Sequence, residues 1–102
     1  MNIIVTTAQL QGVKKAIEGI KNAQSVSEID IMYNPNMEGT LFLRYKSNYV
    51  TEDGAVAVEI NYICVDAKGE SKNCLEAYKD NLYAIIRDCI SINLSSPLVK
   101  VI

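Results

Sequence analysis

Three runs of alternating side chains between residues 28 and 66 constrain this chain more than any other feature. Successive side chains of a strand point to opposite faces, so a period of two predicts strands with one apolar face. The predicted strands are 28–33, 41–46 and 55–66. The positions expected to share the buried face are Ile29, Ile31, Tyr33, Leu41, Leu43, Tyr45, Val56, Val58, Ile60, Tyr62 and Cys64. Polar connectors join the strands, which favours an antiparallel sheet.

Helical patterns lie on both sides of these strands in the sequence. The first is expected to begin at an N-cap, Thr6 or Thr7, and to end at about Ala23 or Gln24. The second is predicted over about 72–92, with Ser71 as its N-cap, because apolar residues recur there at spacings of three and four. The predicted fold class is α+β: an αβββα order in one domain, 1–102, with both helices on one face of a three-stranded antiparallel sheet. Residues 2–6 and 98–102 are candidates for extra short strands.

Small residues form a strip along the first predicted helix. Gly12, Ala16, Gly19 and Ala23 fall on one side of it at helical spacing. Each glycine within a helix costs about 1 kcal/mol relative to alanine. We expect this strip to permit close packing against another part of the same molecule, and packing of a partner helix is the alternative.

The charge balance does not favour extensive binding to phosphate groups. The chain has 102 residues, with ten Lys and Arg against twelve Asp and Glu, a net charge of −2. No apolar run is long enough to span a membrane, and no signal peptide is recognisable. Three unclustered cysteines, Cys64, Cys74 and Cys89, are expected to be reduced, with Cys74 and Cys89 too far apart on one helix to bridge. These observations predict a cytoplasmic protein that does not enter a membrane.

The residues offer little for catalysis. The chain has no histidine, so the usual general base and the commonest metal ligand are missing. The three thiols are interpreted as small hydrophobic residues, and the loop acids do not have the spacing of a calcium site. We therefore expect a non-enzymatic protein that uses no metal and no cofactor. A small enzyme whose site is not identified is an alternative.

The predicted order of elements is similar to that of the double-stranded RNA-binding domain. Gly69-Glu70-Ser71-Lys72 resembles the Gly-x-Ser-Lys entry to the second helix of that family. After Lys72 the family continues with further lysines and small residues, whereas this chain has Asn73, Cys74, Leu75 and Glu76. The resemblance implies an alternative function, a nucleic-acid-binding module. Its phosphate contacts would be Lys68, Lys72 and Lys79.

The main functional hypothesis is protein binding. With both helices on one face, the opposite face of the sheet would be open and would mix apolar and charged residues, as protein interfaces do. That face would present Met32, Phe42, Arg44, Glu59, Asn61 and Ile63. A second candidate surface, suited to self-association, lies near the end of the second helix at Tyr83, Ile86 and Ile90.

We therefore expect a small non-enzymatic cytosolic protein that acts by protein–protein contact, as an inhibitor or accessory subunit, with a homo-oligomer as an option. The predicted order of elements is also similar to that of some phage-encoded inhibitors, including certain anti-CRISPR proteins, which is an analogy of shape.

Overall fold

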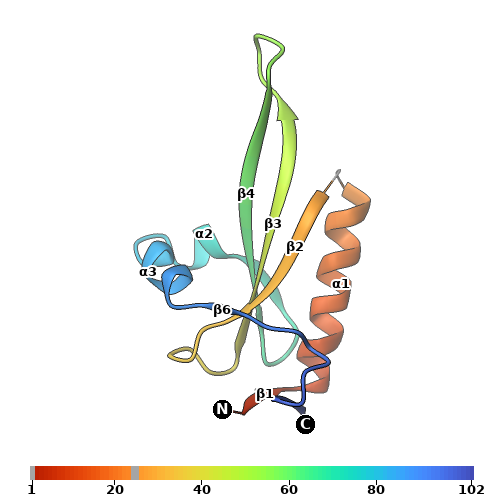
Figure 1. The fold of residues 1–102 in the computed structure, drawn as a ribbon, viewed down its shortest axis with the longest axis vertical. Helices are drawn as coiled ribbons and strands as arrows, with labels where there is room; N and C mark the ends of the chain where they lie inside the picture. Colours follow the sequence, from red (N-terminus) through yellow and green to blue (C-terminus); the bar gives the residue numbers. More distant parts are fainter. Residues whose placement is uncertain (1, 24–25) are drawn as a thin grey trace.

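The computed structural model describes residues 2–23 and 26–102 (Figure 1). The elements are β1 (Ile3–Val5), α1 (Thr7–Ala23), β2 (Val26–Tyr33), β3 (Thr40–Val50), β4 (Val56–Asp66), β5 (Ser71–Asn73), α2 (Cys74–Ala77), α3 (Leu82–Arg87), β6 (Ile90–Ser91) and β7 (Val99–Val101). Five strands form an antiparallel sheet in the order β5-β4-β3-β2-β6, and β1 pairs with β7 in a separate parallel sheet. The α+β class and the three central strands are confirmed.

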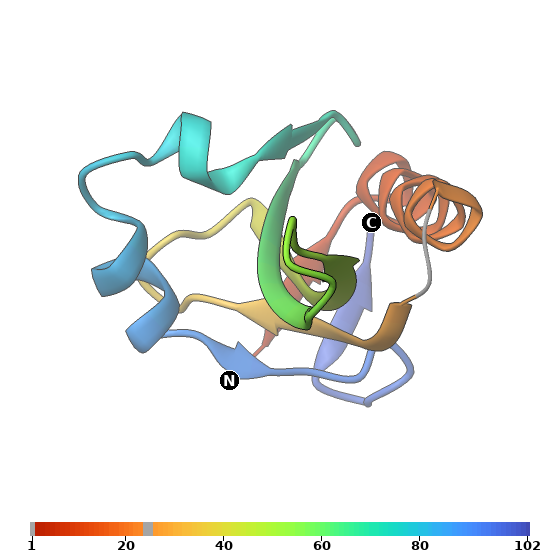
Figure 2. The same ribbon diagram turned by 90° about the horizontal axis from the view of Figure 1, so that it is seen from above.

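The helices lie on both faces of the large sheet, so the prediction of helices on one face is wrong. Figure 2 shows α1 on one side of the sheet and α2 and α3 on the other. The face toward α1 has a buried cluster of Ile3, Val5, Val13, Tyr33, Leu41, Leu43 and Val65. The other face has a cluster of Met32, Phe42, Cys64 and Cys74, against which Tyr78, Leu82, Ile85, Ile86 and Cys89 pack.

The pairing of β3 with β4 shows why the face predicted for the β4 residues is wrong. Leu43 lies opposite Ile63, and residues directly opposite each other share a face. The face of Ile31 and Leu43 therefore continues through Ile63 and Val65. The set from Val56 to Cys64 lies on the other face, because a shift of one residue moves every side chain of a strand across the sheet.

Helix α1 begins where its sequence indicates. The Thr6 hydroxyl accepts a hydrogen bond from the Gln9 N–H at 3.0 Å, which confirms Thr6 as the N-cap. The helix ends at Ala23, and the alternative end, Gln24, lies outside the described residues. The buried Gln9 side chain donates to the carbonyls of Val65 at 3.0 Å and Gly39 at 3.2 Å. These bonds fix the first turns of α1 against the end of the sheet.

The glycine strip of α1 permits one very close contact. A Cβ on Gly12 would collide with the Gly69 carbonyl and lie 2.7 Å from the Gly69 Cα. Gly69 has a φ of 83° in the turn between β4 and β5, so both glycines are needed for this approach. Gly19 has no atom within 4 Å of the corresponding position. The expected close packing is therefore confirmed at Gly12 and absent at Gly19; the side chain of Ala23 lies outside the described residues.

The second predicted helix does not exist as one element. Residues 71–73 form β5, and the two helices that follow have four and six residues. The N-cap is Asn73, whose side-chain oxygen accepts hydrogen bonds from Leu75 N at 2.9 Å and Glu76 N at 3.4 Å, whereas Ser71 was expected to have this role. Asp80 and Asn81, which are poor residues for a helix interior, lie in the break.

Both chain ends contribute short strands, as the sequence allowed. Ile3 N donates to the Leu98 carbonyl at 2.8 Å, and Ile102 N donates to the Val5 carbonyl at 2.9 Å. The C-terminal segment therefore pairs with β1 and does not cover the residues of the second predicted helix. Within the described residues, the helices are all too short or too polar to cross a membrane.

The β3–β4 hairpin extends well beyond the rest of the molecule (Figure 1). The pairing of β2 with β3 starts at Val26 opposite Ser47, and β5 pairs with β4 at Ile63–Val65. We call residues 48–62 the arm: all of its β4 residues lie beyond β5, and residues 48–58 lie beyond the last pair with β2 as well. The molecule measures 48 × 29 × 21 Å. Both termini lie at the end of the molecule opposite the arm.

Candidate functional site

One face of the arm carries branched aliphatic side chains that are open to solvent. The exposed fractions are 70% for Val50, 72% for Val56, 60% for Val58 and 51% for Ile60. Val50 lies opposite Val56, and the two residues that follow at alternate positions of β4 point to the same side. We call these four residues the arm face. They form a contiguous apolar row on a hairpin that is surrounded by solvent.

The arm face continues into a groove at the base of the arm. This groove, the base groove, has a volume of about 490 Å³ and is lined by Tyr62, Leu82, Tyr83, Ile86 and Arg87. Tyr62 is the next β4 residue after Ile60 on the same side, so it links the two surfaces. Tyr83 is 89% exposed and lies on α3. The arm face and the base groove thus meet in one apolar surface.

Charged residues border the arm face on the side of β2 and β3. Arg44 forms an ion pair with Asp30 at 2.7 Å, and Lys46 forms one with Glu28 at 3.2 Å. The hydrogen bond with Asp30 raises the pKa of Arg44. Lys46 lies opposite Ile60 in the sheet. The border therefore combines both signs of charge in matched pairs, which resembles the polar rim of a protein interface.

The six residues predicted to form an open sheet face lie on both faces of the sheet. Met32 and Phe42 are 3% and 0% exposed, because α2 and α3 cover them. Ile63 packs on the opposite face, under α1. The expectation that this part of the sheet is open is therefore wrong.

The three polar members of the predicted set remain accessible in part. Glu59 is exposed, and the Asn61 side chain donates to the Ser47 hydroxyl at 3.1 Å on the same face as Ile63. Arg44 lies on the other side of the sheet, in its ion pair. The predicted set therefore does not form one surface.

The second predicted surface is partly assembled. Tyr83 and Ile86 lie together in the base groove. Ile90 belongs to β6, outside the helix, and is 41% exposed. The structure thus brings together two of the three residues proposed for self-association.

The predicted phosphate contacts lie on three separate segments. Lys68 is in the turn after β4, Lys72 is in β5, and Lys79 is in the connection between α2 and α3; all three are exposed. The Gly69–Lys72 segment that resembles a helix entry instead completes a turn and enters a strand. This geometry differs from the helix start that the resemblance implies.

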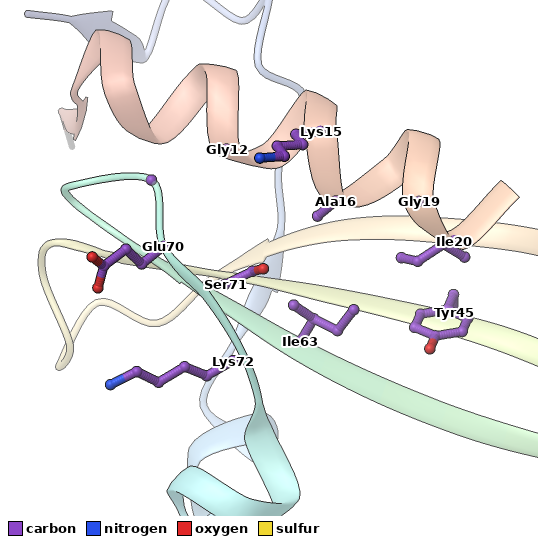
Figure 3. Close-up of a pocket in the computed structure, with 11 residues that line it drawn as sticks. Gly12, Lys15, Ala16, Gly19, Ile20, Tyr45, Ile63, Glu70, Ser71 and Lys72 are labelled. Carbon is purple, nitrogen blue, oxygen red and sulfur yellow. The ribbon is translucent and has the colours of Figure 1, made fainter. Parts of the chain in front are cut away.

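A second groove of about 770 Å³ lies between α1 and β5 (Figure 3). Ala16, Ile20, Tyr45 and Ile63 gather between the helix and the sheet, and Lys15 lies on the helix above them. The side chains of Glu70 and Lys72 extend away from this apolar floor. Ser71, which lies between them in the chain, points to the opposite side of the strand, so its hydroxyl faces away from both charged groups.

The three cysteines, which are unclustered in the sequence, all lie in or against the second core cluster. All three are free thiols. Interaction with Cys74 lowers the pKa of Cys64 to about 7, with further help from Lys72, and the same contact together with burial raises the pKa of Cys74. Burial raises the pKa of Cys89. The idea that Cys74 and Cys89 lie far apart on one helix is wrong.

In residues 2–23 and 26–102, no group of three or more His, Cys, Asp or Glu side chains is arranged so that it could hold a metal ion. Comparisons of the chain with protein-family models, with curated proteins and with solved structures find no match.

Sequence reasoning missed the arm face because it assigned Val56, Val58 and Ile60 to the buried side of the sheet. A signal for it in the sequence is the length of the third predicted strand, 55–66, which exceeds that of both 28–33 and 41–46. A strand that is longer than the neighbouring strands has an end that no neighbour covers.

Proposed function

We propose that this protein is a non-enzymatic binding module that contacts another protein through the arm face and the base groove. The observation that carries this proposal is the row of four branched aliphatic side chains, each more than half exposed, on one side of a projecting hairpin. Burying such a side chain completely is worth about 1.5–3 kcal/mol. Contiguous apolar surface with a polar rim is typical of interaction sites.

The composition of the surface supports a protein as the partner. Tyr62, Tyr83 and Arg87 line the base groove, and tyrosine and arginine are the residue types that most often dominate binding energy at interfaces. The paired charges at the border leave no excess of either sign to attract a polyanion. A partner with an apolar ridge and few charges fits this surface best.

This role is that of an inhibitor or accessory subunit working in the cytosol. Neither groove places a nucleophile beside a base, so its lining does not favour an enzyme. Nucleic-acid binding is the weaker candidate, because Lys68, Lys72 and Lys79 are distributed over three segments of a chain with a net charge of −2.

The test is affinity capture from the native host with a charge placed in the arm face. Ile60→Glu is the probe, and Leu98→Glu is the matched control, because the two side chains are 51% and 49% exposed and Leu98 lies beside β1 at the other end of the molecule. We expect the parent chain and the control to retain the same protein and the probe to lose it. Retention by all three would refute the assignment of this surface.

A further inference from the structure

The outer edge of β4 is open along most of the arm. β5 pairs with β4 at Ile63, Cys64 and Val65, and among the described residues no other strand lies on that side of β4. Residues 56–62 therefore present an unpaired strand edge seven residues long. Such edges are templates for pairing with another chain.

The backbone groups that face this edge can be identified. Asp66 N donates to the Glu70 carbonyl at 3.0 Å, toward β5, and the N–H and C=O of alternate residues in a strand point the same way. The register of β3 with β4 has no shift from Thr40 opposite Asp66 to Val50 opposite Val56. The residues whose N–H and C=O point to the open edge are thus Val56, Val58, Ile60 and Tyr62.

The edge has few of the features that usually prevent pairing. Residues 56–62 contain no proline and no lysine, and Glu59 is their one charged residue. Lysine, proline and bulges are the common means by which proteins protect such edges. Three of the four residues with outward backbone groups are branched aliphatics more than half exposed, which favours a strand partner with the same pattern.

We infer that a second copy of this chain pairs with the edge, antiparallel and across a two-fold axis at Val58. The register follows from two limits. β5 occupies the edge from Ile63 onward, and the tip of the arm, with Gly54 at a φ of 84°, must stop before reaching it. The longest pairing within these limits sets Val58 opposite the partner's Val58 and Val56 opposite the partner's Ile60.

Charge and symmetry both support this register. The register centred on Val58 sets Glu59 opposite the partner's Ala57. A register centred on Glu59 would instead bring the two Glu59 carboxylates together. Like charges directly opposite each other are destabilising. A two-fold arrangement satisfies the open edges of both copies at once, which a foreign strand does not. A shared strand edge buries less than the roughly 800 Å² per partner of a standard interface, so the dimer is expected to be weak.

The dimer uses the edge of the arm and leaves the arm face open. The two arms would form one four-stranded platform with both apolar rows on the same side, since the two-fold axis is perpendicular to the sheet. The inference therefore goes beyond the proposed function. Either can fail without the other: loss of dimer formation does not imply loss of captured partner.

The test is sedimentation equilibrium over a roughly hundredfold range of concentration, with charges placed at the position that faces Glu59 across the axis. We expect the parent chain to show a monomer–dimer equilibrium. Ala57→Lys should strengthen it several-fold and Ala57→Glu should weaken it several-fold, while Ala57→Glu combined with Glu59→Lys restores it. A parent chain that is monomeric at every concentration would overturn the inference. So would a dimer whose dissociation constant is the same in all three variants as in the parent chain.

A backbone variant separates the edge from the face. Val58→Pro removes an outward N–H while leaving the hydrogen bonds to β3 in place, and Val58→Thr changes the side chain but keeps the N–H. We expect the proline variant to be monomeric with an unchanged circular dichroism spectrum, and the threonine variant to dimerise. If the proline variant is unfolded, the charge series at Ala57 decides the question alone.

Discussion

At the scale of single residues, the two glycines of α1 have different roles. Gly12 allows the helix to touch the turn at Gly69, whereas Gly19 faces an open groove. The sequence presents them as equivalent members of one strip, because helical spacing places both on the same side. Only the position of the turn after β4 distinguishes them, and that is set by contacts distant in the sequence.

Alanine substitutions should therefore have opposite effects at the two glycines. Gly12→Ala should destabilise the protein by about 1–3 kcal/mol, because the new Cβ collides with backbone atoms that cannot move freely. Gly19→Ala should stabilise it by up to about 1 kcal/mol, because alanine favours the helix and meets no atom within 4 Å. Urea unfolding of both variants measures the difference. Equal effects in the same direction would show that α1 does not pack on the Gly69 turn.

A pH dependence of stability follows from the thiol of Cys89. Burial, and to a lesser extent Asp88, raises its pKa above the ordinary value of 9.0 in the folded protein. The unfolded chain then loses this proton more readily, so the contribution of Cys89 is present below pH 9 and is lost as the pH rises through the folded pKa.

We therefore expect the free energy of unfolding to fall as the pH rises above about 9, with Cys89 contributing at most about 1.4 kcal/mol per pH unit. Cys89→Ala should reduce this fall without abolishing it, since the pKa values of Cys74 and Tyr78 are also raised. Urea unfolding at several pH values makes the comparison. An identical slope in the variant would contradict burial of the Cys89 thiol.

At the scale of elements, α3 depends on the body of the protein for its position. It has six residues and no side-chain hydrogen bond at its N-cap. The buried Asn34 side chain donates to the Ile85 carbonyl at 2.9 Å and accepts from Asn36 N at 2.8 Å. A helix of this length is not stable alone, so this bond and the packing of Ile85 hold it against the sheet.

Asn34→Ala should lower the free energy of unfolding by about 1–3 kcal/mol, because the Ile85 carbonyl and the Asn36 N–H each lose a hydrogen bond to this side chain. The amides of α3 should lose more protection from hydrogen exchange than those of α1. Pro35→Ala, at an exposed neighbouring position, is the control and should change α3 little. Equal loss of protection in both helices would mean that Asn34 supports the whole fold and not α3 in particular.

The elements that could be predicted are those determined locally. Helix α1 has a capping residue and an amphipathic pattern within its own span, and each central strand has its own alternation. The face of β4 could not be assigned from its residues, because Ile63 and Val65 make the second set of alternate positions apolar as well. The register with β3 decides between the two sets, and it is a long-range property.

The candidate surface could not be predicted for a related reason. One helix over 72–92 would be about 31 Å long and could cover much of a sheet face. The segment instead folds as two short helices that cover Met32, Phe42 and Cys64 and end at the base of the arm. The aliphatic residues farther along β4 therefore stay exposed, although their alternation is typical of a buried strand.

At the scale of the whole molecule, the body and the arm differ in what they contain. The body contains both core clusters and both chain ends, whereas the arm holds little that the core needs. The exposed aliphatics on it are a liability for solubility unless a partner covers them. We propose a division of roles in which the body maintains the fold and the arm contacts other proteins.

Site-specific photo-cross-linking tests whether the arm is the part that contacts another protein. A benzophenone amino acid at Val58 or at Leu98, positions 60% and 49% exposed at opposite ends of the molecule, reports which end touches another protein in the native host. We expect a discrete cross-linked product from position 58, containing a partner or a second copy, and none from position 98. Products from position 98 alone, or from neither position, would contradict the assignment of the arm as the contact surface.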